Sequence, residues 1–181
     1  MAVTLKRKLD YDDYAGIPSD RNRYEIMDGD LFVTPAPSPV HQRVSRRLQR
    51  ILEDYFHGLQ LGEVFNAPID VILGQHDVVQ PDLVVVADPA QVSARGIEGA
   101  PFLVVEILSP STAKQDQTVK ARRYAAFGVP HYWMVDPEAR RLERYRLTAG
   151  DYAMVVQAEG DALLVHPDWP GLTVPLADLW R

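Results

Sequence analysis

The chain has 181 residues, of which 46% are hydrophobic and 24% charged, as is typical of an ordinary soluble globular protein. Its formal net charge is −6, so the chain as a whole is not a polycation that coats nucleic acid, although a local basic patch is compatible with this total. The chain has no cysteine, which excludes disulfides, thiolate metal sites and thiol nucleophiles.

The overall pattern predicts a single domain over residues 1–181, located in the cytoplasm. No apolar stretch approaches the ~20 residues that cross a bilayer. Residues 1–13 are charged and lack the apolar centre of a signal peptide. The sequence also shows no internal repeat, low-complexity tract or linker that would divide it.

The N-terminal part of the chain predicts a β-hairpin followed by a long helix. Segment 23–33 surrounds Asp28-Gly29, a dipeptide that favours a two-residue hairpin turn. Three prolines then end the hairpin: Pro35, Pro37 and Pro39. The helix is expected over Ser38–His57, with the serine as N-cap. Its apolar face at helical spacing comprises Val40, Val44, Leu48, Ile51, Leu52 and Tyr55.

The remainder of the chain predicts short strands and one further helix. Before that helix, strands are expected near 62–66 and 69–73 and at the runs 80–86 and 102–110, with 87–101 as a loop. The helix begins at Ser111 or Thr112 and ends near Phe127. After it come strands 131–135, 142–147 and 152–156, a further strand or two, and a short closing segment, 176–180. The predicted class is therefore α/β, with a mixed sheet and few helices.

Two of the predicted strands each carry one carboxylate beside a β-branched, apolar run. The runs are Gln80-Pro81-Asp82-Leu83-Val84-Val85-Val86 and Phe102-Leu103-Val104-Val105-Glu106-Ile107-Leu108-Ser109-Pro110. An acid in such a strand loses several kcal/mol of solvation unless its charge is compensated. Two acids on neighbouring strands repel each other, and a divalent cation is the usual remedy. The pattern predicts a metal site at Asp82 and Glu106.

The second of these strands and the helix after it suggest a partner for the two acids. In the strand, one face is expected to carry Phe102, Val104, Glu106 and Leu108. On the helix, at ~100° per residue, one arc carries Ala113, Asp116, Lys120, Tyr124 and Phe127. Because the aromatic residues favour burial, Lys120 is expected to be drawn toward the sheet. There its amine would orient or deprotonate an attacking water, or stabilise charge on a phosphate.

These motifs resemble those of a known group of nucleases. The Pro-Asp start of one strand and the apolar-Glu-apolar centre of the next are similar to the PD-(D/E)XK superfamily, whose strand lysine would fall at Leu108 here. The strings 105–112, Asp116…Lys120…Tyr124 and 128–137 look like the Uma family of restriction-endonuclease-like proteins, as do 24–31 and Pro35…His41. The resemblance covers roughly residues 9–147.

The resemblance implies a fold, a site and an activity. The fold would be restriction-endonuclease-like, a central mixed β-sheet flanked by helices with an added N-terminal β-hairpin. Asp82 and Glu106 would bind Mg²⁺, with Mn²⁺ as a substitute, Lys120 would be the helix-borne lysine, and Glu25 the upstream acid that completes the metal shell. The activity would be hydrolysis of DNA phosphodiester bonds by metal-activated water. We expect a homodimer, because two sites cut two strands most simply.

Simpler roles remain open for the same residues. Asp82 is compatible with a turn at a strand entrance, and Glu106 with a buried ion pair to an arginine. Lys120 and Asp116 would also suit a solvated pair on a helix surface. Glu25 is equally compatible with an exposed cross-strand position.

The first long helix carries a histidine and an arginine cluster. His41 lies at the edge of the apolar face, where a packed or hydrogen-bonded histidine is commoner than a catalytic one. The cluster consists of Arg43, Arg46, Arg47 and Arg50, of which Arg43, Arg47 and Arg50 are our candidate phosphate contacts. Such a face is more often merely solvated.

Two other functions compete with the nuclease hypothesis. One is a non-catalytic binding or assembly module that keeps the nuclease fold, which Leu108 and the acidic net charge favour. The other is a metal-dependent hydrolase of a small phosphoester, which would require a deep enclosed pocket. The direction of Lys120 separates the first alternative from the nuclease, because a solvent-facing amine could not serve the site.

Overall fold

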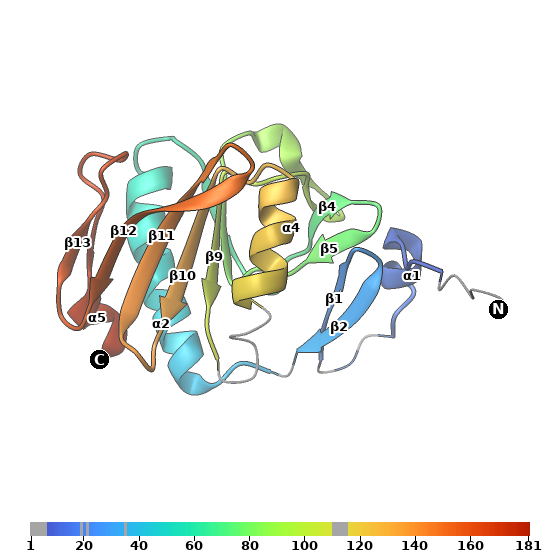
Figure 1. The fold of residues 1–181 in the computed structure, drawn as a ribbon, viewed down its shortest axis with the longest axis horizontal. Helices are drawn as coiled ribbons and strands as arrows, with labels where there is room; N and C mark the ends of the chain where they lie inside the picture. Colours follow the sequence, from blue (N-terminus) through green and yellow to red (C-terminus); the bar gives the residue numbers. More distant parts are fainter. Residues whose placement is uncertain (1–6, 19, 21, 35, 110–115) are drawn as a thin grey trace.

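The computed structural model describes residues 7–18, 20, 22–34, 36–109 and 116–181. Within these residues the strands form two six-stranded sheets and a two-stranded one. Figure 1 shows the main sheet at the centre and the second sheet toward the N-terminus. None of the described helices is both long and apolar enough to cross a membrane.

The main sheet is mixed, as predicted. Its order is β12-β11-β10-β9-β6-β3. The strands are β3 (Glu63–Asn66), β6 (Leu83–Val86), β9 (Leu103–Ile107), β10 (His131–Asp136), β11 (Arg141–Thr148) and β12 (Asp151–Glu159). The β9–β10 pair is parallel and the other pairs are antiparallel. A parallel pair needs a long crossover connection, and the chain between β9 and β10 contains the helix that carries Lys120.

The second sheet contains the predicted N-terminal hairpin. Its order is β2-β1-β5-β4-β8-β7. The strands are β1 (Arg23–Met27), β2 (Asp30–Thr34), β4 (Val71–Gly74), β5 (Asp77–Val79), β7 (Val92–Ser93) and β8 (Gly96–Glu98). Asp28 and Gly29 join β1 to β2 with φ of 53° and 79°, the left-handed values that a type I′ turn requires. The hairpin is thus the edge of a larger sheet and not a separate addition.

The prediction that 87–101 is a loop is wrong. This segment contains the short 3₁₀ helix η2 (Pro89–Gln91) and the strands β7 and β8. Strands of two or three residues are too short for an alternating pattern to be recognised in the sequence. The remaining strands, β13 (Leu163–Val165) and β14 (Thr173–Pro175), pair with each other in the predicted tail.

The described helices include those at the two predicted places, together with short helices near the two ends of the chain that were not predicted as helices. They are α1 (Tyr11–Ala15), α2 (Pro39–Leu52), η1 (Glu53–His57), η3 (Asp116–Lys120), α4 (Ala121–Ala126) and α5 (Leu176–Trp180). The Ser38 side chain caps α2 by accepting a hydrogen bond from the His41 amide at 3.2 Å. On the apolar face, Val40 is 49% exposed, contrary to prediction, and Phe56 is buried. The predicted helix start at Ser111 or Thr112 lies outside the described residues.

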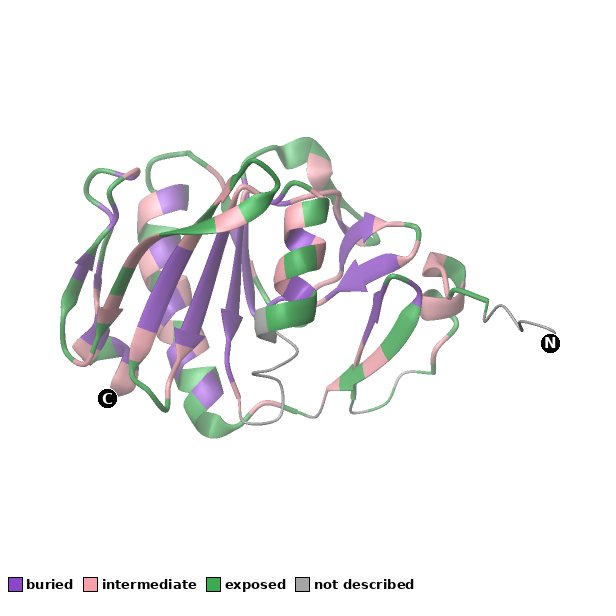
Figure 2. Cartoon of the chain, viewed as in Figure 1, coloured by how far each residue is buried: buried purple, intermediate pink, exposed green. Residues whose placement is uncertain are grey.

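Helices α2 and α4 cover opposite faces of the main sheet (Figure 1). Leu48 of α2 lies in one hydrophobic cluster and Tyr124 of α4 in the other. The central strands between them are buried along their length (Figure 2). Phe102 packs on the α2 side and not on the Glu106 face, contrary to prediction, because it precedes β9 and is outside its alternation.

A buried cation lies under aromatic rings on the α2 side of the sheet. Arg144 is fully buried, its guanidinium carbon 3.9 Å from the centre of the Trp133 ring, and its side-chain nitrogens have no hydrogen-bond partner among the described residues. His166 stacks on Trp169 with ring centres 3.9 Å apart. Burial and the nearby Arg144 charge lower the pKa of His166 to about 3.

This cluster predicts that the protein loses stability in mild acid. The unfolded chain takes up a proton on His166 near pH 6.5, whereas the folded chain does so only near pH 3. Stability therefore falls as the pH decreases through this window, by roughly 1.5 kcal/mol between pH 6.5 and 5. Urea denaturation across this range should show the slope in the wild type and a flatter profile in His166→Asn. Equal slopes in the wild type and in His166→Asn would contradict the assignment of this pH dependence to His166.

Candidate active site

The predicted Pro-Asp motif lies where the chain passes from one large sheet to the other. Strand β5 of the second sheet ends at Val79 and β6 of the main sheet begins at Leu83. Arg23 and Glu25 are two residues apart in β1, so their side chains lie on the same face of the strand. Both hold the backbone that links β5 to β6. Glu25 accepts a hydrogen bond from the Gln80 amide at 2.7 Å, and the Arg23 guanidinium donates to the Gln80 carbonyl. Strand β1 therefore fixes the segment that ends in Asp82.

Asp82 is buried, with both carboxylate oxygens engaged. Its Oδ1 lies 3.2 Å from Nη1 of Arg23, and its Oδ2 accepts hydrogen bonds from His41 Nε2 at 3.0 Å and the Ile107 amide at 2.8 Å. Burial acts to raise the pKa of Asp82, but the His41 hydrogen bond and the Arg23 charge outweigh it and lower that pKa. The carboxylate is therefore ionised at neutral pH.

Glu106 lies on the strand beside Asp82. In the β6–β9 pair Leu83 faces Val105, so one further step of the same register brings Asp82 and Glu106 side by side. Glu106 is 2% exposed and accepts hydrogen bonds from the Tyr124 hydroxyl at 2.6 Å and the Lys120 amine at 3.1 Å. Among the described residues it thus forms an ion pair with Lys120.

Lys120 connects two carboxylates. Its amine is 3.0 Å from Glu25 Oε1 and 3.1 Å from Glu106 Oε1, and the residue is only 4% exposed. Lys120 is therefore not part of a solvated surface pair, and Glu25 is buried and not an exposed cross-strand residue. Leu108, where the resemblance seen in the sequence would place a strand lysine, packs in the same hydrophobic cluster as Tyr124.

Tyr124 reaches the acids from α4. Burial and the charge of Glu106 raise its pKa well above the ordinary value of 10, so the phenol stays protonated and donates to Glu106. The structure therefore brings together the four predicted residues and three that the sequence did not assign to the site, Arg23, His41 and Tyr124. The position of Arg23 two residues before Glu25, on the same face of a predicted strand, was a usable signal.

The arginines of α2 have different surroundings. Arg47 donates hydrogen bonds to the carbonyls of Leu179 (3.2 Å) and Arg181, so it caps the C-terminal helix. Arg43 and Arg50 are exposed and do not line a described pocket, whereas Arg46 lines a pocket that reaches Asp82. Of the four, Arg46 is the one that shares a described pocket with Asp82.

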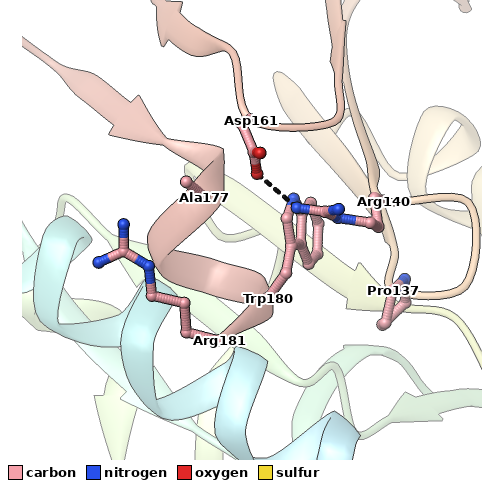
Figure 3. Close-up of a pocket in the computed structure, with 6 residues that line it drawn as sticks. All are labelled: Pro137, Arg140, Asp161, Ala177, Trp180 and Arg181. Atoms are coloured by element: carbon pink, nitrogen blue, oxygen red, sulfur yellow. Dashed lines mark hydrogen bonds and ion pairs between the residues drawn. The ribbon is translucent and has the colours of Figure 1, made fainter.

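A second cavity of about 470 Å³ lies beside the C-terminal helix (Figure 3). Arg140 and Asp161 form an ion pair across it, and the indole of Trp180 donates to the Gly160 carbonyl at 2.7 Å. The cavity shares no lining residue with the acidic cluster. Its contacts connect α5 to neighbouring turns and suggest no chemistry.

The donor set of the acidic cluster suits a hard divalent cation. Among the described residues, no three histidine, aspartate or glutamate side chains are arranged as a ready metal shell. Mg²⁺, however, is commonly held by one or two carboxylates and keeps several waters. Asp82 and Glu106 on adjacent strands supply such carboxylates, with Glu25 joined to Glu106 through Lys120. The residues present therefore fit the ion.

Comparison with known proteins identifies a family for this chain. The family model Uma2, described as "Putative restriction endonuclease", matches residues 10–177. A Synechocystis protein named "Uncharacterized protein slr1290" is 31% identical over 106 residues, which are 58% of this chain and 55% of that protein. The chain thus spans about half the length of this relative.

A solved structure has the same fold. It is the crystal structure of a protein from Anabaena variabilis, titled a "putative nuclease belonging to DUF820". The two structures superpose with a TM-score of 0.76 at 20% sequence identity, over 95% of this chain and 97% of the other. At this level of identity the likeness establishes the fold, and the predicted fold class is confirmed.

Proposed function

Because the chain belongs to the Uma2 family, we propose that it is a divalent-cation-dependent endonuclease that hydrolyses phosphodiester bonds of DNA. The observation that carries this proposal is the position of the Lys120 amine. It lies 3.1 Å from Glu106, on the strand beside Asp82, and is buried. A solvent-facing lysine would have favoured the non-catalytic alternative.

Asp82 and Glu106 would hold Mg²⁺, or Mn²⁺ in its place, with Glu25 as a further carboxylate. When bound, the ion supplies positive charge to a phosphate oxygen and lowers the pKa of a water. The charges of the cluster support this role. Asp82 pairs with Arg23, and Glu25 and Glu106 share Lys120. A divalent ion added to these carboxylates would contribute positive charge and so favour the approach of a phosphodiester.

The protein groups would act by positioning and by hydrogen bonding. An ammonium donor at Lys120 would orient the attacking water and stabilise the charge that develops on the phosphate. Tyr124 would hold Glu106 in place through its short hydrogen bond. His41 carries its hydrogen on Nε2, because a carboxylate can only accept, and so fixes Asp82. We also propose a single domain over residues 1–181 and a homodimer that cuts both strands.

Plasmid nicking together with calorimetry tests this function. The wild type is expected to bind Mn²⁺ and to nick supercoiled DNA in Mg²⁺ but not in EDTA. Glu106→Gln should lose both activities. Glu143→Gln, which alters a buried glutamate of β11 outside the site, should keep both.

The contrary outcomes separate the alternatives. Metal binding without nicking would refute DNA as the substrate while supporting the metal site. No metal binding by the folded wild type would refute the nuclease proposal and favour the non-catalytic binding or assembly module.

A further inference from the structure

A polar pocket opens beside Asp82, between α2 and the segment after β3. Its volume is about 290 Å³, at the lower end of the range for ligand sites. One wall is a stripe of α2 side chains at spacings of three and four residues: Gln42, Ser45, Arg46 and Gln49. Asn66 at the end of β3 and the following Ala67 also line the pocket, as do Arg23, His41 and Asp82. The pocket therefore leads from the exposed surface of α2 to the acidic cluster.

The lining provides hydrogen-bonding groups and one exposed cation. Three carboxamides line the pocket, of Gln42, Gln49 and Asn66. The Gln49 amide already donates to Glu53 at 2.8 Å and the Asn66 amide to the Ala67 carbonyl at 3.0 Å, so these two offer mainly their acceptor oxygens. Arg46 is exposed and forms no ion pair within the described part of the chain. An arginine beside carboxamide donors and acceptors forms a mixed polar surface of the kind that binds phosphate, sugar and base edges.

Two atoms of the pocket residues nearest to the acids lack a partner. His41 Nδ1 and Arg23 Nε are buried and form no hydrogen bond with any described residue. Buried polar atoms without partners are uncommon, and a bound water or ligand is one of the usual reasons for them. This end of the pocket therefore has unused capacity for hydrogen bonding next to the carboxylate proposed to hold the metal.

We propose that this pocket binds the nucleotide adjacent to the scissile phosphate, with Arg46 on its outer phosphate and the carboxamides on its sugar and base. The inference rests on the proposed nuclease function and assigns the path of the substrate strand. The volume suits one nucleotide unit, and the strand would leave along the α2 stripe. Because the net charge of the chain is −6, a single local cation affects the binding of a nucleic acid strand more here than it would on a basic protein.

Oligonucleotide binding by matched arginine variants tests the proposal. The probe is a fluorescein-labelled single-stranded oligothymidylate of about 12 nucleotides, followed by anisotropy at low salt. Ca²⁺ replaces Mg²⁺ so that binding is measured apart from cleavage. Arg46→Ala should weaken binding about fivefold to tenfold and lower the salt slope by about 0.7. Arg43→Ala removes the same charge from the same helix outside the pocket and should change affinity less than about twofold.

A second variant examines the carboxamides. Gln49→Leu keeps the size of the side chain and should weaken binding about threefold, provided its thermal unfolding matches the wild type. Equal effects of Arg46→Ala and Arg43→Ala, or no effect of either, would overturn the subsite.

The subsite and the nuclease function fail in different ways. Nicking by the wild type with no selective effect of Arg46→Ala would refute the subsite alone. A wild type that neither binds Mn²⁺ nor nicks would refute the nuclease function itself. Mn²⁺ binding by Arg46→Ala should equal that of the wild type, because Arg46 is not among the acids proposed to hold the ion.

Discussion

Lys120→Met is expected to lower the free energy of unfolding by about 3–5 kcal/mol in the absence of divalent cations, because a buried ion pair that loses one partner leaves an uncompensated charge. Here two carboxylates lose their counter-ion at once, since Glu25 and Glu106 both lie within 3.1 Å of the amine. Urea denaturation in EDTA measures this change. Nicking should be lost in the same variant.

Metal should partly rescue the Lys120→Met protein. A divalent ion bound among the acids would replace the missing positive charge, so Mn²⁺ should raise the melting temperature of the variant more than that of the wild type. The matched control is Lys8→Met, because Lys8 pairs with Asp28 on the surface and should change stability little. If both lysine variants lost the same stability, Lys120 could not be the counter-ion of the cluster.

Asp82→Asn is expected to abolish calorimetric Mn²⁺ binding and to slow nicking more than about 100-fold. Loss of a group that only orients a metal ligand already lowers metal affinity or activity by roughly 10–100-fold. Asp82 is proposed as a ligand itself, so the effect should be larger. Asparagine keeps an acceptor for the Ile107 amide but leaves Arg23 without its anion. Stability should therefore also fall, by about 3–5 kcal/mol at neutral pH.

The pH dependence of stability gives a further measure of the same variant. The pKa of Asp82 in the folded protein is lowered from the unfolded value of 3.8. The carboxylate therefore contributes to the free energy of unfolding above pH 3.8, and this contribution is lost as the pH falls through the folded pKa. Asp82→Asn should lack this part of the acid transition.

Asp77→Asn is the matched control for metal binding. Asp77 is also buried and forms a bidentate pair with Arg123, at 2.7 and 2.5 Å, outside the site. This variant should lose stability yet still bind Mn²⁺. Loss of metal binding in both variants would mean that general destabilisation, and not the Asp82 carboxylate, explains the result.

The strands that carry the two acids could be predicted because each rule involved is local. A continuous apolar run indicated buried strands at Leu83–Val86 and Leu103–Ile107, and a helical arc directed Lys120 inward. Arg23 and His41 were harder to assign, because their contact with Asp82 joins positions 59 and 41 residues apart. No periodicity reports such contacts, which depend on how the two sheets and α2 are placed.

The short strands β5, β7 and β8 show another limit. β5 pairs with β1 and β4, β8 pairs with β4, and β7 pairs with β8, so their own two or three residues carry little signal. Of the second sheet, only the hairpin and the strand near 69–73 were therefore predicted, and the turn of that hairpin was correct.

The site is divided between the two large sheets, and this has a consequence for folding. Arg23 and Glu25 come from one sheet, whereas Glu106 comes from the other, and Asp82 ends the segment that joins them. Until the sheets dock, Asp82 lacks its arginine and Lys120 lacks one of its carboxylates. Assembly of the acidic cluster and closure of the tertiary structure should thus be one cooperative event, detectable as a single hydrogen-exchange unit. A chain from which the residues before β2 have been removed lacks β1. It should lose the assembled site and the closed tertiary structure together.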